Sequence, residues 1–278
     1  METYLLSIAC KDQKGLIHHI TGVLLKYDLN IVSNAEYVER ATNSFFMRTE
    51  FAGKIDIETV KQLLINVLPA KATVHLTKNE PKNIVILVTK ESHCLGDLLI
   101  RHHSNELHTH ICAVIGNYNH LASLTEHFGI PFVHVGHEEK SREEHENELL
   151  KTLAFYNPHY IVLAKYMRIL SEKFVAQFPN RIINIHHSFL PAFVGARPYQ
   201  QAHERGVKII GATAHFVNNL LDEGPIIAQN VIPVNHSHSA KEMMQAGKDV
   251  EKIVLAKALK LVLEEKVFVS QNKTIILE

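Results

Sequence analysis

The sequence predicts an α/β protein in two parts: a ferredoxin-like βαββαβ domain at residues 1–80 and a Rossmann-like domain with a mostly parallel sheet at residues 83–278. Two observations predict this division. In the first part, short apolar runs alternate with apolar residues at helical spacing. In the second, continuous apolar runs recur, separated by segments long enough for helices. The polar residues 78–82, which include a proline, form a suitable linker.

The first domain is expected to alternate short strands with two helices. Apolar residues at a spacing of three and four predict a helix, and short apolar runs bounded by turn residues predict strands. The expected strands are residues 4–9, 31–39, 44–51 and 72–76, and the expected helices are residues 15–26 and 57–67. This is the order of a ferredoxin-like domain.

The second domain is expected to contain strands that are buried on both faces. Their apolar runs do not alternate with polar residues, which favours a parallel sheet covered by helices on both sides. These runs are residues 84–88, 111–115, 160–164, 182–185 and 209–212. The clearest helices are residues 142–155 and 240–263, and residues 267–277 are expected to form a terminal hairpin that turns at residues 271–273.

Composition excludes several classes of function. The 29 basic residues balance the 29 acidic ones, so no broad positive field exists to bind nucleic acid. Cys10, Cys94 and Cys112 are odd in number and lack metal-ligand spacing, which disfavours a disulfide framework and a zinc site. No signal peptide and no run of roughly 20 apolar residues is present, so we expect a cytoplasmic protein without a membrane partner.

An amide, an imidazole and a carboxylate form the candidate catalytic group. Asn184 and His186 end one predicted strand, two residues apart and therefore on the same face, and Asp222 follows another. Ligands of such sheets gather at the carboxyl ends of the strands. The three groups could supply an oxyanion donor, a proton shuttle and an orienting acid. Each is also a common turn residue, and the sequence Asp-Glu-Gly-Pro at residues 222–225 is typical of a turn.

Three stretches, residues 184–191, 211–217 and 221–227, resemble the formyltransferase family that uses 10-formyltetrahydrofolate. The resemblance covers about residues 83–278. It implies that Asn184, His186 and Asp222 are catalytic, that no metal or prosthetic group is needed, and that the folate is the substrate. It further implies a pterin pocket formed by residues 165–170 and 216–222, with substrate contacts from Met167, Arg168, Leu170, Val217 and Asn218.

The turn after residues 84–88 bears on the acceptor of the formyl group. Transferases of this family that act on glycinamide ribonucleotide carry a Gly/Ser-rich turn there, whose N–H groups hold a phosphate. Residues 90–96 contain one glycine, and Glu91 lies where an anion would bind. The tRNA-specific members need a basic module after the transferase domain, and this chain ends at Glu278. Water is therefore the expected acceptor.

The order of the two domains, with residues 186–193 and 195–199, is similar to the formyltetrahydrofolate deformylases. This resemblance implies hydrolysis to formate and tetrahydrofolate, which would supply formate for purine biosynthesis and balance the one-carbon folate pool. Two alternatives remain: a formyltransferase to a small amine, and a folate sensor with an inactive domain. His187 is interpreted as a capping or water-placing residue, and Cys94 as a buried filler.

The turn at residues 11–17, with residues 28–31 beyond the first helix, resembles the ACT family of regulatory domains. The resemblance implies a homo-oligomer that binds a small amino acid as effector at the seam between subunits. Asp12, Gly15 and Asn30 are the candidate effector contacts.

Overall fold

The computed structural model describes residues 2–192 and 198–278, so part of the motif at residues 195–199 and Phe193 lie outside the described residues. The chain forms two compact units. One comprises the residues up to Glu80 together with Glu264–Ser270 and Ile275–Glu278, and the other comprises Pro81–Leu263 and Gln271–Thr274.

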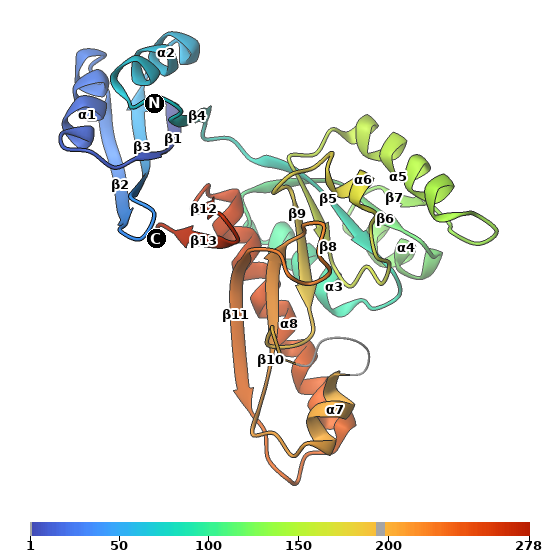
Figure 1. Cartoon of the computed structure of the whole chain (residues 1–278). Coiled ribbons are helices and arrows are strands. Elements are labelled where there is room, and N and C mark those ends of the chain that lie inside the picture. Colours follow the sequence, from blue (N-terminus) through green and yellow to red (C-terminus); the bar gives the residue numbers. More distant parts are fainter. Residues whose placement is uncertain (1, 193–197) are drawn as a thin grey trace. The chain divides into compact units, whose positions relative to one another are not determined.

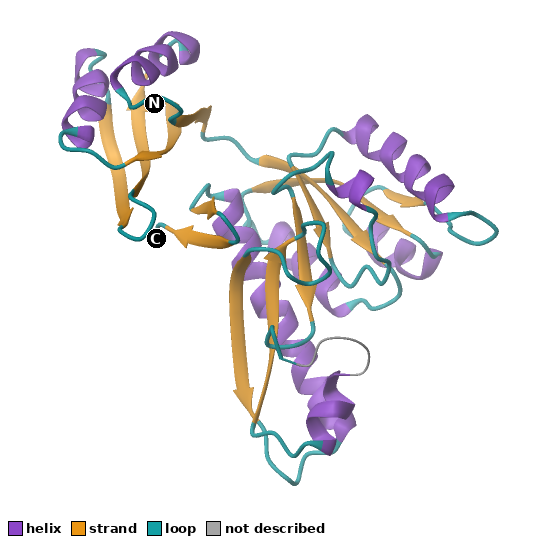
Figure 2. Ribbon diagram, in the orientation of Figure 1, coloured by secondary structure: helices purple, strands orange, loops and turns teal. Residues whose placement is uncertain are grey.

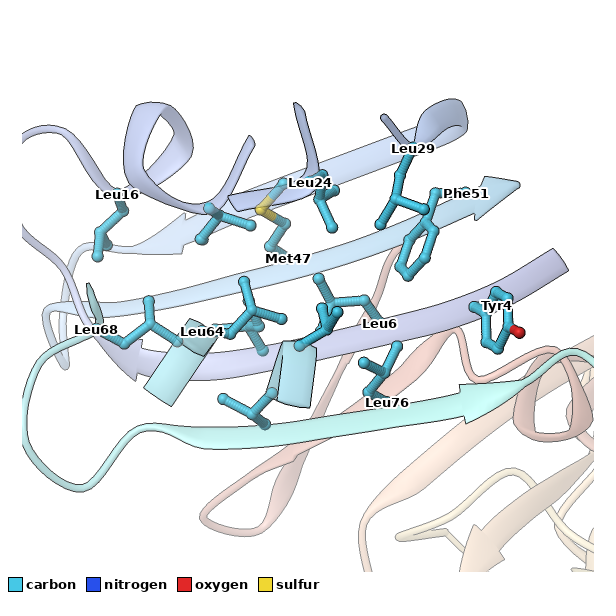
Figure 3. Close-up of a cluster of buried hydrophobic side chains, with 14 of the residues drawn as sticks. Tyr4, Leu6, Leu16, Leu24, Leu29, Met47, Phe51, Leu64, Leu68 and Leu76 are labelled. Carbon is cyan, nitrogen blue, oxygen red and sulfur yellow. The ribbon is translucent and has the colours of Figure 1, made fainter. Parts of the chain in front are cut away.

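The first unit has the predicted order of elements (Figure 1). They are β1 (Glu2–Lys11), α1 (Leu16–Lys26), β2 (Asn30–Glu39), β3 (Ser44–Gly53), α2 (Ile57–Val67) and β4 (Thr73–Lys78). The sheet is antiparallel in the order β2-β3-β1-β4. Both helices bury one apolar stripe against this sheet, in a core that includes Leu6, Met47, Phe51, Leu24 and Leu64 (Figure 3).

The C-terminal segment corrects one expected boundary. We expected residues 83–278 to form one domain, but Glu264–Ser270 and Ile275–Glu278 belong to the first unit. Arg48 Nε donates a hydrogen bond to the Glu264 carbonyl at 2.8 Å, and the Phe46 and Phe268 rings pack edge to face. These contacts hold the segment beside residues more than two hundred positions away. The expected hairpin itself is present as β12 (Val267–Ser270) and β13 (Lys273–Ile276).

The second unit is built on a seven-stranded sheet. Its strands, in the spatial order β11-β10-β9-β8-β5-β6-β7, are Ile226–Pro233, Ile209–Phe216, Ile182–His186, Tyr160–Leu163, Lys82–Val88, Thr109–Gly116 and Phe132–His134. The strands β5 to β9 are parallel, and β10 and β11 are antiparallel, so the prediction of a mostly parallel α/β sheet is confirmed. The predictions missed β7, which has three residues, and β11, which is half exposed and carries Gln229 and Asn230.

Helices cover both faces of this sheet (Figure 2). They are α3 (His93–His103), α4 (Ala122–His127), α5 (Arg142–Tyr156), α6 (Glu172–Val175), α7 (Pro198–Glu204) and α8 (Ala240–Leu263), with a short 3-10 turn at Asn119–Leu121. Leu149 of α5 and Phe174 of α6 pack in one core cluster with Val85 and Leu163. The helix α8 packs against β9, β10, β11 and α3. Continuous apolar strands fit this arrangement because both of their faces are buried.

No helix in residues 2–192 and 198–278 combines the length and the apolar character that a membrane crossing requires.

Candidate active site

A pocket of about 460 Å³ opens beside the carboxyl ends of β8 and β9. It is lined by the segment after β8, the end of β9 and the loop between β10 and β11. The lining residues are Leu163, residues 165–170, residues 184–187, His215 and residues 217–222. The sheet therefore brings together segments that are distant in the sequence, as open α/β sheets commonly do at this edge.

The three candidate catalytic residues all line this pocket. Asn184 and His186 lie two residues apart on β9, so both side chains leave the same face of the strand. The Nδ1 atom of His186 lies 3.3 Å from an Asp222 carboxylate oxygen. Within the described residues, His186 Nε2 is buried and has no hydrogen-bonding partner. An imidazole with one nitrogen on a carboxylate and the other unpartnered can exchange a proton with a ligand.

The loop that carries Asp222 is held by a close backbone contact. The Phe216 N–H donates to the Pro225 carbonyl at 2.9 Å, which closes the loop. A side chain at Gly224 would overlap the Phe216 carbonyl oxygen, so the glycine of the Asp-x-Gly motif permits this approach. Asp222 has a φ of 58°. Its hydrogen bond with His186 lowers its pKa against the opposing effect of burial, so Asp222 is a carboxylate at neutral pH.

His215 is a site residue that the sequence analysis did not identify. Its Nδ1 lies 2.9 Å from the Phe216 carbonyl, which can only accept, so Nδ1 carries the proton. Burial lowers the pKa of His215, which keeps the ring neutral. Its Nε2 therefore accepts from the Asn184 amide at 3.2 Å. This bond orients the amide, and the antiparallel pairing of Asn184 with His215 is the register that makes it possible.

The five expected substrate contacts, Met167, Arg168, Leu170, Val217 and Asn218, all line the pocket. The Met167 N–H donates to the Thr89 hydroxyl at 2.9 Å, and the Ile169 carbonyl accepts from Arg142 at 2.8 Å. These bonds hold the irregular segment after β8, which is neither helix nor strand. Met167, Ile169, Leu220 and Leu221 are exposed, so the pocket has an apolar rim that suits a flat aromatic ligand.

A buried ionic cluster lies behind one end of the pocket, and the sequence analysis missed it too. Glu251 of α8 is 1% exposed, and its carboxylate lies 3.2 Å from the Lys165 ammonium. His93 Nε2 and the Tyr199 hydroxyl both lie 2.8 Å from the same carboxylate. Burial alone would raise the pKa of Glu251, but the His93 bond and the Lys165 charge outweigh it and lower the pKa to about 2.

His93, Cys94 and Glu251 also offer three possible metal-ligand atoms within 4.8 Å of one another. The Lys165 ammonium already neutralises Glu251, and burial raises the pKa of the Cys94 thiol, so the sulfur is not an anionic ligand. The group is better described as an ion-pair network than as a metal centre. Cys94 is completely buried, as expected for a filler.

His187 provides a test of the electrostatics at this end of the pocket. Its ring stacks on that of His186 with the centroids 5.0 Å apart. Burial first, and then the Lys165 charge, lower its pKa to about 4 from a normal value of 6.5. Between these two pH values the unfolded chain binds the proton and the native protein does not, so stability should fall as the pH falls.

We expect His187→Gln, which stays uncharged, to flatten the pH dependence of stability between pH 6.5 and 4. Urea unfolding of both proteins at several pH values measures this. The free energy of unfolding of the native sequence should lose up to about 3 kcal/mol more than that of the variant across this range. Parallel curves for the two proteins would show that His187 titrates normally.

The three candidate effector contacts are not brought together within one chain. Gly15 has a φ of 87° and lies in the turn before α1, close to Asp12. Lys11 pairs with Ser44 on β3, whereas Asn30 pairs with Ala52 near the other end of that strand. A strand rises about 3.3 Å per residue, so these ends are roughly 25 Å apart. Within one chain, Asn30 therefore lies far from the turn that holds Asp12 and Gly15.

Comparison with known proteins agrees with this geometry. A family model described as formyl transferase matches residues 82–259, so the chain belongs to the formyl transferase family. Over its whole length it is 54% identical to the formyltetrahydrofolate deformylase of Haemophilus influenzae, and the alignment covers 100% of both proteins. The chain is accordingly a member of the formyltetrahydrofolate deformylases within that family.

Two solved structures support the same assignment. A formyltetrahydrofolate deformylase from Pseudomonas syringae pv. tomato is 38% identical, has a TM-score of 0.96, and covers 100% of this chain and 95% of its own. A formyltetrahydrofolate deformylase from Burkholderia mallei is 33% identical, has a TM-score of 0.94, and covers 100% of both chains. The similarity thus includes the first unit as well as the second.

Proposed function

We propose that this protein hydrolyses 10-formyltetrahydrofolate to formate and tetrahydrofolate at the pocket beside β8 and β9. The observation that carries the proposal is the pairing of His186 with Asp222 at 3.3 Å, beside an Asn184 amide oriented by His215. The released formate would serve purine biosynthesis and the folate would return to the one-carbon pool. Three free cysteines fit a reducing compartment such as the cytoplasm.

In the proposed reaction, a water oxygen attacks the formyl carbon and the carbonyl oxygen becomes an oxyanion. Asn184 can donate its second amide hydrogen to that oxyanion, because His215 occupies only the first. A protonated His186 adds a second donor through Nε2, and the Asp222 carboxylate stabilises its charge. Preorganised donors of this kind act without reorganisation during the reaction.

The Asp222 carboxylate accepts the proton that water loses. The bond between the formyl carbon and the folate nitrogen then breaks, and that nitrogen takes the proton that Asp222 holds and leaves as a neutral amine. The atoms balance, because one water and one 10-formyltetrahydrofolate give one formate, one proton and one tetrahydrofolate. The lowered pKa of Asp222 keeps the carboxylate in its proton-accepting form at neutral pH.

Purified protein should release formate from 10-formyltetrahydrofolate when no amine is added. Formate and tetrahydrofolate should appear in equal amounts, and EDTA should not slow their release, because protein side chains supply the donors and the base. The alternative, transfer to a small amine, predicts turnover only after an amine is supplied. Assaying formate with and without glycinamide separates the two.

We further propose that the first unit is an ACT-like regulatory domain that joins chains into a homo-oligomer and binds an amino acid. The edge strand β2 supports this, since among the described residues one side of it pairs with no other strand, and Ile31, Val32 and Tyr37 on it are exposed. An exposed strand of ten residues can pair with a second copy. A seam between chains could bring Asn30 of one copy near the Gly15 turn of another.

An amino acid effector should change both the melting temperature and the rate of the full-length protein. Gly15→Asp should remove this response while leaving basal hydrolysis intact, because the φ of 87° and the nearby His19 ring disfavour any side chain there. Gly22→Ala, in an open part of α1, is the matched control. If no amino acid in a panel changes the melting temperature or the rate, the first unit serves only to assemble the oligomer.

A further inference from the structure

The strongest unexplained feature of the pocket is Lys165. The residue is 6% exposed, yet it lines the same pocket as His186, His187 and Asp222. Its backbone has a φ of 61°, in the left-handed region that residues other than glycine adopt at some cost. Strain of this kind persists where the surrounding structure enforces it, and it is concentrated at functional sites.

The Lys165 side chain and the residues that follow it contact helices on different faces of the sheet. Its ammonium pairs with Glu251 on α8, whose other partners include His93 on α3. The carbonyl of Ile169, four residues later, is bonded instead to Arg142 on α5. The segment therefore crosses the edge of the sheet, with its cation on the α3 and α8 side and its apolar rim on the α5 side.

The ion pair with Glu251 does not by itself explain why a lysine occupies position 165. Replacing a buried ion pair with apolar residues of similar volume is often neutral or stabilising. A buried ammonium has three hydrogens to donate, and Glu251 is its one ion-pair partner among the described residues. Because Lys165 lines the same pocket as the candidate catalytic residues, its ammonium can donate a hydrogen bond to a ligand there.

We propose that the Lys165 ammonium binds the attacking water and makes water, rather than an amine, the acceptor of the formyl group. The inference rests on the proposed hydrolysis. A water oxygen has two lone pairs: one forms the new bond to the formyl carbon while the other accepts from Lys165. One of its protons is transferred to the Asp222 carboxylate, and the O–H that remains donates a hydrogen bond to the neutral His187 ring. Lys165 keeps its own proton throughout.

An amine cannot make the same pair of interactions. Its single lone pair is used in the attack, so one hydrogen of the buried ammonium would be left without an acceptor. Protonated amines are also repelled by the fixed cation. A site that donates to one acceptor atom discriminates strongly against a competitor that lacks it.

The test uses the full-length protein and three variants. Lys165→Met removes the charge and keeps an unbranched side chain that is one atom shorter. Lys165→Met combined with Glu251→Gln removes both charges and leaves no unpaired carboxylate. Lys248→Met is the matched control, because Lys248 pairs with Glu91 near the cluster but does not line the pocket. Melting temperature and tetrahydrofolate binding report whether each variant is folded. If Lys165→Met alone does not fold, the rate of the double variant tests the proposal.

Lys165→Met should lower formate release by at least about tenfold with tetrahydrofolate binding retained, and the double variant should stay equally slow. With glycinamide present, both should raise the ratio of formylglycinamide to formate relative to the native protein. Lys248→Met should match the native protein. Recovery of the native rate in the double variant would overturn the proposal, since Lys165 would then only neutralise Glu251. A native protein that releases no formate without amine would instead refute the proposed hydrolysis.

Discussion

Replacing Asp222 by asparagine is expected to lower formate release by about a hundredfold or more, the scale of general base catalysis. The substitution keeps the size of the side chain but removes the proton acceptor and the carboxylate that faces His186 at 3.3 Å. Steady-state formate release and tetrahydrofolate binding measure the two effects separately. The loss should fall on kcat, because an asparagine can still occupy the loop.

Glu223→Gln is the matched control for this variant. Glu223 is the adjacent acidic residue, is exposed, and does not line the pocket. It should leave the rate unchanged. Native-like activity in Asp222→Asn would remove the carboxylate from the mechanism, whereas loss of activity in both variants would indicate a general disturbance of the loop.

The second large effect is expected at Asn184. Asn184→Ala removes one donor to the oxyanion, which costs on the order of 3 kcal/mol of transition-state stabilisation and about a hundredfold or more in rate.

His186→Ala should cause a loss of similar size. His215→Phe keeps a ring but cannot accept from the Asn184 amide, so it should lower kcat by freeing the amide to rotate. Equal rates for Asn184→Ala and the native protein would show that the oxyanion is stabilised elsewhere.

Much of the fold could be predicted because the local patterns agree with the final structure. The apolar runs at β5, β6, β8 and β9 are buried on both faces, and α8 begins and ends at the predicted residues. The assignment of the C-terminal segment failed for a physical reason. Its contacts with Arg48 and Thr77 span about two hundred residues of sequence, and no local pattern records them.

The candidate catalytic group was predicted from its motif, and the structure brings all three residues to one pocket. Their roles stay predictions. His215 was missed because its part depends on the β9 and β10 register, although it lies within the quoted stretch at residues 211–217. The position of Glu251 in the sequence could have predicted the buried ionic cluster. It lies on the buried stripe of α8, between Gly247 and Leu255, where an acidic residue needs a buried partner.

The central claim is that water attacks the formyl carbon in this pocket, and isotope labelling tests it most directly. The native protein would be given 10-formyltetrahydrofolate in water labelled with heavy oxygen and no amine, and the formate would be analysed by mass spectrometry. We predict one labelled oxygen in each formate, formed together with one tetrahydrofolate, and about a hundredfold less of this labelled product from Asp222→Asn in the same time. Unlabelled formate, or turnover only when an amine accepts the formyl group, would contradict the account.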